Sequence, residues 1–189
     1  MREAFCYTSV MFKKFYPDAI EESAYVIDYK ALYEDGYRGL IFDIDNTLVE
    51  HGAPATDRAK ELIRNVKNIG FDVVVLSNNK EPRVKSFCDA VGCSYFYKCN
   101  KPMKRAYNNA MDKMHTDSAT TVSVGDQIFT DVWGARRLKI KSILVKPIDK
   151  HEEIQIILKR RLEWLVLNEY RRRLNKINLL EDKREKHGN

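Results

Sequence analysis

Two carboxylates stand close together at the end of an apolar run in the first third of the chain. The run Gly39–Asp45 reads GLIFDID, so Asp43 and Asp45 are two residues apart and project to the same side of an extended strand. Unpaired, they would repel each other and lose hydration, and a bound cation removes both costs. One carboxylate can then act as a nucleophile and the other as a general acid and base.

Two other interpretations of this segment are possible. An Asp-Asn turn that caps a helix stays open as an alternative on the segment alone. An EF-hand is excluded because, counting from Asp43, position 6 is Leu48 instead of glycine and position 12 is Pro54 instead of glutamate.

A lysine follows the third apolar run of the chain. Lys101 directly precedes Pro102, which we expect to open a helix, so the lysine should lie beside a strand end. An ammonium group there can neutralise a phosphoryl group as negative charge builds up. An ordinary surface lysine is the alternative, and Lys98 and Lys104 compete for the same role.

Polar residues also follow the second and fourth runs. Ser77–Asn79 supply a hydroxyl and two amides that can hold a phosphate oxygen, although the same residue types are common in loops. Gly125 lets the backbone approach closely, and Asp126 offers the hard oxygen ligand that Mg²⁺ prefers. Asp131 could hold a metal-bound water or Lys101.

The elements that must position these residues alternate regularly. Strand and helix in alternation predict an α/β fold with a mainly parallel, five-stranded sheet and helices on both faces, which makes three layers. The expected strands are Gly39–Asp45, Phe71–Asn78, Ser94–Lys98, Thr121–Asp126 and Lys141–Pro147, and the expected helices are Thr56–Ile69, Glu81–Val91, Pro102–Met114 and Ile128–Leu138. Ligands of such sheets bind beyond the carboxyl ends of the strands, where all four polar groups fall.

Local signals mark the expected helix ends. Thr56 is a candidate N-cap, and Gly70 is a candidate C-terminal stop. Pro82 and Pro102 suit the first turn of a helix, where a missing N–H costs little.

Positive charge is concentrated in the last part of the chain. Residues 136–189 hold 16 Lys and Arg against 8 Asp and Glu, in a chain whose formal net charge is +6. Helical periodicity over residues 151–176 gathers Ile154, Leu158, Leu162, Leu165 and Val166 on one face, which Arg161 interrupts, and the triplets Lys159–Arg161 and Arg171–Arg173 supply charge. Such a helix can contact an anionic membrane surface, a nucleic acid or an acidic protein, or cover the domain with its charges solvated.

Composition bounds the class of protein. The 189 residues are 44% hydrophobic and 32% charged, with 8 Phe, 10 Tyr and 2 Trp, which excludes disorder throughout. The longest uncharged stretch, Ala4–Phe12, is far shorter than the roughly 20 residues of a membrane-spanning helix and is followed by no cleavage site. Four irregularly spaced cysteines predict reduced thiols instead of a zinc site or disulfides. We therefore expect a cytoplasmic protein.

Three segments are expected along the chain. Residues 1–37 form a lead-in, irregular or helical, that packs on the domain; residues 38–150 form the core; and residues 151–189 form the basic amphipathic helix and tail.

In their order, the motifs resemble the haloacid-dehalogenase (HAD) superfamily of phosphatases. The resemblance lies in D-x-D-x-T at 43–47, Ser77, Lys-Pro at 101–102 and G-D-x-x-x-x-D at 125–131. The segments GYRGLIFDIDNTLVEHGAP, SNN, NKP and VGDQIFTD, preceded by a Phe-Tyr-Pro lead-in, are similar to the YqeG-type subfamily, which is related to mitochondrial phosphatidylglycerophosphate phosphatase. The short connections between the motifs leave no room for a large cap domain.

This resemblance implies a Rossmann-like fold and a role for each motif. Asp43 would attack phosphorus and become an aspartyl-phosphate, and Asp45 would protonate the leaving oxygen and then deprotonate the hydrolytic water. Mg²⁺ would be bound by Asp43, the backbone carbonyl of Asp45 and Asp126, with Asp131 supporting that shell. Substrate would be bound by Thr47, Ser77, Asn78 and Lys101, of which Ser77 and Lys101 would hold the phosphoryl oxygens.

The expected function is a Mg²⁺-dependent phosphomonoesterase. An open site and a basic helix are compatible with phosphatidylglycerophosphate as substrate and with peripheral contact at the inner face of the membrane. A soluble phosphatase of nucleotides, sugar phosphates or a phosphoprotein is the alternative enzyme. A nucleic-acid-binding or ribosome-associated protein with this fold is the alternative from another class, although the chain has no zinc finger and no RNP-type motif. A receiver domain would carry its phosphorylated Asp where this chain has Lys98-Cys99-Asn100. No oligomeric state is predicted.

Overall fold

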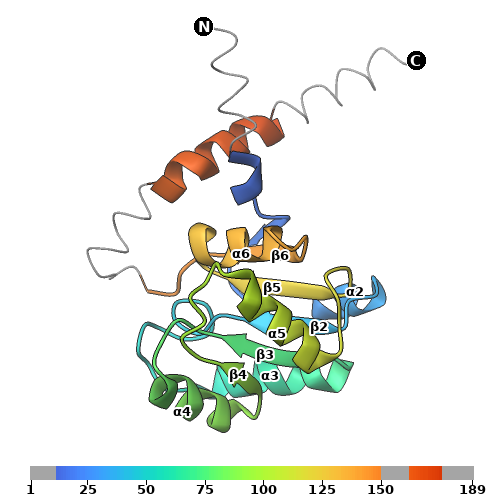
Figure 1. The fold of residues 1–189 in the computed structure, drawn as a ribbon, viewed down its shortest axis with the longest axis vertical. Helices are drawn as coiled ribbons and strands as arrows, with labels where there is room; N and C mark the ends of the chain where they lie inside the picture. Colours follow the sequence, from blue (N-terminus) through green and yellow to red (C-terminus); the bar gives the residue numbers. More distant parts are fainter. Residues whose placement is uncertain (1–11, 150–161, 176–189) are drawn as a thin grey trace, which may run out of the picture. The chain divides into compact units, whose positions relative to one another are not determined.

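The computed structural model describes residues 12–149 and 162–175. The chain divides into two compact units, one formed by Pro17–Glu152 and the other by Met1–Tyr16 together with Glu153–Asn189. Figure 1 shows the ribbon with the residue numbers in colour. The Pro17–Glu152 unit contains the whole sheet and all the predicted site residues.

The larger unit is built on one sheet of six parallel strands in the order β1-β6-β5-β2-β3-β4 (Figure 1). β2 lies in the middle, with Gly39 opposite both Asp72 of β3 and Thr121 of β5. The predicted α/β fold with a parallel sheet is confirmed. The strands are β1 (Ala19–Glu21), β2 (Gly39–Phe42), β3 (Asp72–Leu76), β4 (Ser94–Phe96), β5 (Thr121–Gly125) and β6 (Lys141–Val145).

The sixth strand was missed by the sequence analysis, which expected five. β1 pairs with β6, with Ala19 opposite Ile143, in a segment that was expected to be irregular or helical. It is three residues long and shows no hydrophobic alternation of its own. A tertiary contact sets its place: the Asp18 carboxylate accepts hydrogen bonds from the backbone N–H and the hydroxyl of Ser142, at 2.8 and 2.9 Å.

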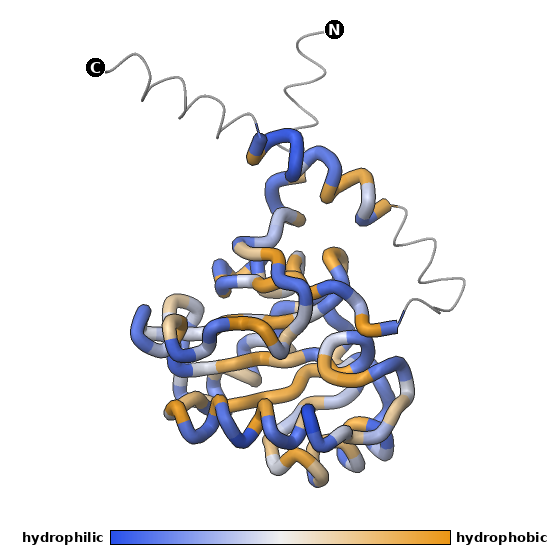
Figure 2. The backbone as a smooth tube through the Cα atoms, turned by 180° about the vertical axis from the view of Figure 1, so that it is seen from behind, coloured by the Kyte–Doolittle hydropathy of each residue, from blue (hydrophilic) through white to orange (hydrophobic). Residues whose placement is uncertain are grey.

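Helices cover both faces of the sheet, as the alternation predicted. α2 and α3, together with α4, pack on the face that carries Leu40 and Phe42 of β2, while α5 and α6 pack on the opposite face around Ile41. Figure 2 shows the strands as the most continuous apolar segments. The helices are α2 (Tyr29–Glu34), α3 (Asp57–Ile69), α4 (Glu81–Val91), α5 (Lys104–Met114) and α6 (Trp133–Arg136), and a π-helical turn, η2 (Ile128–Val132), precedes α6.

The predicted helix ends are mostly confirmed. The Thr56 hydroxyl accepts a hydrogen bond from Ala59 N at 3.2 Å, and Gly70 ends α3 with φ = 121°, a value that favours glycine. Pro82 lies in the first turn of α4. Pro102 does not open α5, because it lies in a turn and the helix begins at Lys104.

The smaller unit has two described parts, the 3₁₀ turn η1 (Lys13–Phe15) with its neighbours and a helix over residues 162–175. Within this unit, the rings of Tyr16 and Tyr170 are 5.1 Å apart. Val166 is buried, whereas three large apolar side chains of the helix are more than half exposed: Leu162, Trp164 and Leu165. Ile154, Leu158 and Lys159–Arg161, which were predicted to belong to this helix, lie outside the described residues. No helix within residues 12–149 and 162–175 is long and apolar enough to span a membrane.

Candidate active site

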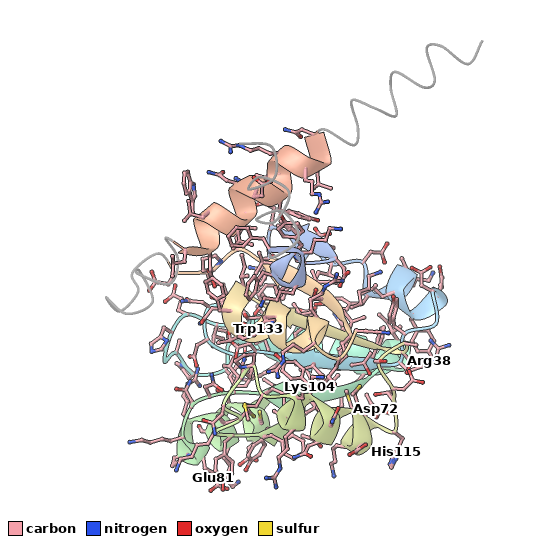
Figure 3. The ribbon with its side chains drawn as sticks, turned by 45° about the horizontal axis from the view of Figure 1, so that its top comes forward. Arg38, Asp72, Glu81, Lys104, His115 and Trp133 are labelled. Carbon is pink, nitrogen blue, oxygen red and sulfur yellow. The ribbon has the colours of Figure 1, made fainter. Side chains whose placement is uncertain are left out.

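The predicted site residues leave the sheet at the carboxyl ends of its strands. Asp43 directly follows β2, Ser77 directly follows β3, and Asp126 directly follows β5, while Lys101 lies in the loop between β4 and α5. Figure 3 labels residues near both ends of the strands. Arg38 and Asp72 lie where β2 and β3 begin, and Glu81 and Lys104 are the first residues of α4 and α5, which follow the carboxyl ends of β3 and β4. The parallel pairing thus brings four motifs from distant parts of the chain to one edge.

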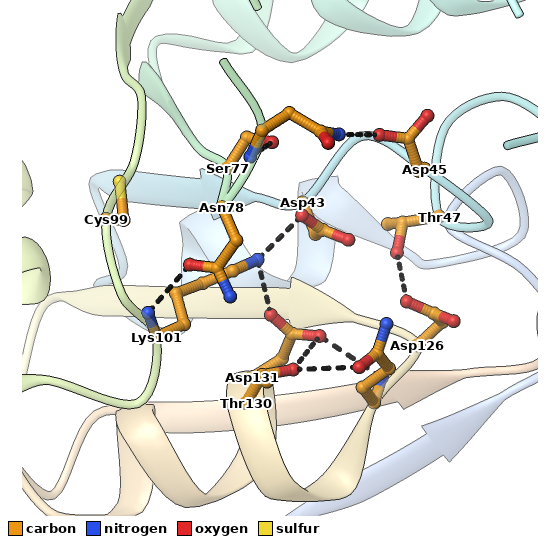
Figure 4. A network of polar contacts seen from close by, with 12 residues as sticks. Asp43, Asp45, Thr47, Ser77, Asn78, Cys99, Lys101, Asp126, Thr130 and Asp131 are labelled. Carbon is orange, nitrogen blue, oxygen red and sulfur yellow. Dashed lines mark hydrogen bonds and ion pairs between the residues drawn. The ribbon is translucent and has the colours of Figure 1, made fainter. Parts of the chain in front are cut away.

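Three buried or nearly buried carboxylates converge at this edge. Asp43, Asp126 and Asp131 each offer an oxygen, and these oxygens lie within 4.8 Å of one another. The Lys101 ammonium reaches between two of them, 2.6 Å from Asp43 Oδ1 and 2.7 Å from Asp131 Oδ1 (Figure 4). The Lys101 side chain is only 4% exposed, so these ion pairs are screened very little by water.

Burial and charge oppose each other in this cluster. Burial raises the pKa of Asp43 to about 6, with the Lys101 ammonium acting against the shift and the Asp131 carboxylate adding to it. Burial alone would lower the pKa of Lys101, but Asp131 and Asp43 together outweigh it and hold that pKa well above its usual value. Lys101 is therefore a permanent cation within an acidic cluster.

Asp131 is fixed by the loop after β5. Its Oδ2 accepts a hydrogen bond from Gln127 N at 3.1 Å, and the Tyr107 hydroxyl of α5 donates to the Thr130 carbonyl at 3.0 Å. A Cβ atom on Gly125 would lie 2.4 Å from Asp131 Cγ, closer than real Cβ atoms approach another heavy atom. The close approach inferred for this glycine from the sequence is thus an approach of the Asp131 side chain to the backbone.

The remaining predicted substrate-binding residues surround the cluster. The Thr47 hydroxyl donates to Asp126 Oδ1 at 3.4 Å, and Thr47 is fully buried. Asn78 Oδ1 accepts a hydrogen bond from Lys101 N at 2.7 Å, which ties the end of β3 to the loop that carries the lysine. The Ser77 hydroxyl is buried at the same strand end and accepts from Asn79 N at 3.2 Å.

The Asp45 carboxylate lies apart from the three converging carboxylates. Its Oδ2 accepts from the Asn79 amide, and its Oδ1 accepts from Gly52 N at 2.8 Å and from Arg83 Nη2 at 3.0 Å. Figure 4 shows the contact between Asp45 and the amide. The predicted metal contact of Asp45 concerns its backbone carbonyl and stays a prediction.

One residue in this part of the site, Arg83 in the first turn of α4, was missed by the sequence analysis. Asn79 was considered there as a donor to a phosphate oxygen, and its contact with Asp45 was not foreseen. The available signal was an arginine in the first turn of the helix that follows a strand end. By itself this signal does not say where the side chain points.

The donor set fits a hard divalent cation. The converging ligands are all carboxylate oxygens, and oxygen-only sets of this kind suit Mg²⁺, with neighbouring positions left for water or phosphate. A carboxylate, a fixed ammonium group and a cation site at one strand edge can position a phosphoryl group and compensate its charge, which is what phosphoryl transfer requires.

The chain was compared with known proteins. A family model described as HAD-hydrolase-like matches residues 98–155. The probable phosphatase YqeG of Bacillus subtilis (strain 168) is 37% identical over 165 residues, which cover 86% of this chain and 96% of that protein.

Two further matches are more distant. Phosphatidylglycerophosphate phosphatase 1, chloroplastic/mitochondrial, of Arabidopsis thaliana is 26% identical over 165 residues, 78% of this chain, and the chain spans 45% of that protein's length. The cobalt-bound structure of the deoxy-D-mannose-octulosonate 8-phosphate phosphatase YrbI of Haemophilus influenzae is 14% identical, with a TM-score of 0.47, over 71% of this chain and 90% of that one.

Proposed function

Because the chain belongs to the YqeG-type family of HAD phosphatases, we propose that it hydrolyses a phosphate monoester through a phosphorylated Asp43, with Mg²⁺ as its metal. One observation carries this proposal: Asp43, Asp126 and Asp131 converge around the Lys101 ammonium at the carboxyl edge of the sheet. A purely structural cluster has no need of a third carboxylate beside two that already share one lysine.

The metal would be held by Asp43 and Asp126, together with the backbone carbonyl of Asp45, and Asp131 would support that shell. When bound, a divalent cation neutralises negative charge on the phosphoryl oxygens. This assignment is supported by the convergence of the carboxylate oxygens within 4.8 Å.

In the first half of the reaction, Asp43 attacks phosphorus and the bond to the leaving oxygen breaks. Asp45, in its protonated form, gives its proton to that oxygen, so the products of this half are an alcohol and an aspartyl-phosphate. In the second half, Asp45 takes a proton from water while the water oxygen attacks phosphorus. Inorganic phosphate leaves, and Asp43 is restored.

The remaining residues bind and orient the phosphoryl group. Lys101 and Ser77 would hold its oxygens, as expected from a buried ammonium in the loop after β4 and a buried hydroxyl at the end of β3. Asn78 would keep Lys101 in place through its bond to Lys101 N, and Thr47 would orient Asp126.

We further propose a lipid substrate, with phosphatidylglycerophosphate as the first candidate. The Arabidopsis relative is named for that substrate, although the chain spans less than half of it. The helix over residues 162–175 supports the same proposal, because Leu162, Trp164 and Leu165 are exposed on it and its later part carries the charges of Arg171–Arg173. Exposed Trp and Leu with arginines are typical of helices that lie on anionic membranes.

A substrate panel tests the activity. The purified protein is assayed with Mg²⁺ against phosphatidylglycerophosphate in vesicles, nucleotides, sugar phosphates and a phosphopeptide. We expect the lipid to give the highest kcat/KM, EDTA to stop turnover, and Asp43→Asn to lower kcat by several orders of magnitude because an amide forms no acyl-phosphate. Activity in EDTA, or more than a tenth of the wild-type rate from Asp43→Asn, would refute the mechanism. A preference for a soluble ester would refute only the lipid substrate.

Co-sedimentation with vesicles tests the membrane contact. Changing Arg171, Arg172 and Arg173 to Gln should reduce pelleting with anionic vesicles and flatten its dependence on salt. The matched control changes Lys60, Arg64 and Lys67 of α3 to Gln, which removes the same charge from another helix. Equal pelleting by both variants would refute the docking role, and salt-dependent binding to RNA but not to vesicles would favour the nucleic-acid alternative.

A further inference from the structure

Arg83 contacts one carboxylate oxygen of Asp45, the proposed acid and base. Asp45 Oδ1 accepts from both Gly52 N, at 2.8 Å, and Arg83 Nη2, at 3.0 Å, while the Asn79 amide occupies Oδ2. A carboxylate has about four lone-pair sites, so three donors leave only one of them, on Oδ2. Release of a donor from Oδ1 would make that oxygen available to the leaving oxygen of a substrate as well.

Arg83 is the donor best able to leave. Gly52 donates through its backbone, and Asn79 has a short side chain that starts at the strand end, whereas Arg83 is long and its side chain is still 20% exposed. Its guanidinium is also incompletely satisfied: Arg83 Nε is buried and has no hydrogen-bond partner. A buried N–H without a partner is unfavourable, so a ligand that offers it an oxygen is favoured.

The position of Arg83 determines which part of a substrate would meet it. Its Nη2 is 3.0 Å from Oδ1 of Asp45, the residue that would give the leaving oxygen its proton. The group attached to the leaving oxygen would therefore lie close to Arg83. A guanidinium binds carboxylate and phosphate oxygens in pairs, and the first turn of the 11-residue helix α4 adds a favourable field for an anion.

We propose that Arg83 forms an anion-binding subsite for the leaving group: it binds a second anionic group, a phosphodiester or a carboxylate, carried by the alcohol part of the substrate. As Arg83 moves to that anion, it gives up Asp45 Oδ1, which becomes available to the leaving oxygen. This inference rests on the proposed phosphatase function and deepens it. Preferred substrates are phosphate monoesters with a second negative charge a few bonds from the ester oxygen.

Matched pairs of soluble esters test the subsite. 2-Phosphoglycerate and glycerol 2-phosphate differ by a carboxylate in place of a hydroxymethyl group, and 3-phosphoglycerate and glycerol 3-phosphate differ in the same way at greater distance. The quantity measured is the ratio of kcat/KM for the anionic ester to kcat/KM for its neutral partner. A charge-assisted hydrogen bond contributes about tenfold to hundredfold in binding, so Arg83→Gln should lower at least one of the two ratios by that factor. Arg83→Lys should restore part of it.

Arg64→Gln is the matched control, because it removes the same charge from an exposed position of α3 and should leave both ratios unchanged. If neither ratio changed in Arg83→Gln, the subsite would be overturned. It would also be overturned if the ratios fell equally in Arg64→Gln, because that result would indicate a long-range electrostatic effect. Turnover of these esters by the wild type, and its loss in Asp43→Asn, tests the phosphatase function by itself. The effect of Arg83→Gln on the ratios tests the subsite.

A binding measurement gives a second arm that needs no turnover. Calorimetric titration of the same esters into Asp43→Asn, with and without Arg83→Gln, should show the same loss of preference for the anionic ester. The proposal would be overturned if Asp43→Asn bound the anionic and the neutral ester equally well. It would also be overturned if the double variant preferred the anionic ester as strongly as Asp43→Asn does.

Discussion

Replacing Lys101 by Met should destabilise the metal-free protein and make its stability depend on Mg²⁺. Lys101 is only 4% exposed in its side chain and contacts two carboxylates at 2.6 and 2.7 Å. The oxygens of a third carboxylate, Asp126, lie within 4.8 Å of those of the other two. Methionine keeps most of the side-chain volume, so the substitution chiefly removes the charge.

The expected size of the effect follows from burial. Removing one partner of a buried ion pair costs about 3–5 kcal/mol, because it leaves charge without compensation in a poorly solvated place. For a protein of this size, 1 kcal/mol corresponds to about 2–4 °C, so the melting temperature in EDTA should fall by about 6–20 °C. Excess Mg²⁺ should stabilise Lys101→Met more than the wild type, since a ligand that binds the native state stabilises it by mass action.

Thermal unfolding followed by circular dichroism, in EDTA and in Mg²⁺, measures both effects. Lys85→Met is the matched control: Lys85 pairs with Asp89 in α4, but both side chains are more than half exposed, and such pairs contribute little. If the two variants melted at the same temperature in EDTA, the charge balance inferred for the buried cluster would be wrong. Equal stabilisation of Lys101→Met and wild type by Mg²⁺ would show that the metal does not take over the role of the ammonium.

Three further changes test the architecture of the site. Asp126→Ala should raise the Mg²⁺ concentration for half-maximal activity at least tenfold, because the loss of even outer-shell groups weakens metal binding by about 10–100-fold; an unchanged titration would exclude Asp126 as a ligand. Gly125→Ala should lower kcat at least about tenfold, because the new Cβ would lie 2.4 Å from Asp131 Cγ and would push that side chain out of place. The control Gly92→Ala, whose Cβ would meet no atom within 4 Å, should affect stability alone. Thr56→Ala should cost about 1 kcal/mol in urea unfolding through the lost N-cap of α3 and leave kcat unchanged.

The convergence of the motifs was predictable because a parallel sheet brings the carboxyl ends of its strands to one edge. Asp43, Ser77 and Asp126 each follow a strand directly, and the order of the motifs along the chain was enough to predict their proximity. Lys101 was harder to assign against Lys98 and Lys104. The structure distinguishes Lys101 by the contacts of its ammonium group with Asp43 and Asp131 and by the bond from its backbone N–H to Asn78, tertiary contacts that residue types alone do not reveal.

The contacts that were not predictable depend on how loops close in space. β1 has three residues and takes its register from Asp18 and Ser142, which are 124 positions apart in the chain. The direction of Arg83 toward Asp45 depends on the loop that brings Gly52 N to the same carboxylate oxygen. Periodicity describes one element at a time, so contacts of this kind are visible only once the elements are assembled.

The two halves of the site differ in charge, and this difference suggests how they divide the work. Asp43, Asp126 and Asp131 with Lys101 carry a formal charge of minus two when all are ionised, which one divalent cation would bring to zero. Asp45 and Arg83 are already neutral as a pair. A divalent cation would therefore neutralise the first half, while the second has no net charge for a cation to neutralise and would respond, as proposed above, to an anion that competes for Arg83. On this view, the acidic half recognises the transferred phosphoryl group through its metal, and the Asp45–Arg83 half distinguishes one leaving group from another.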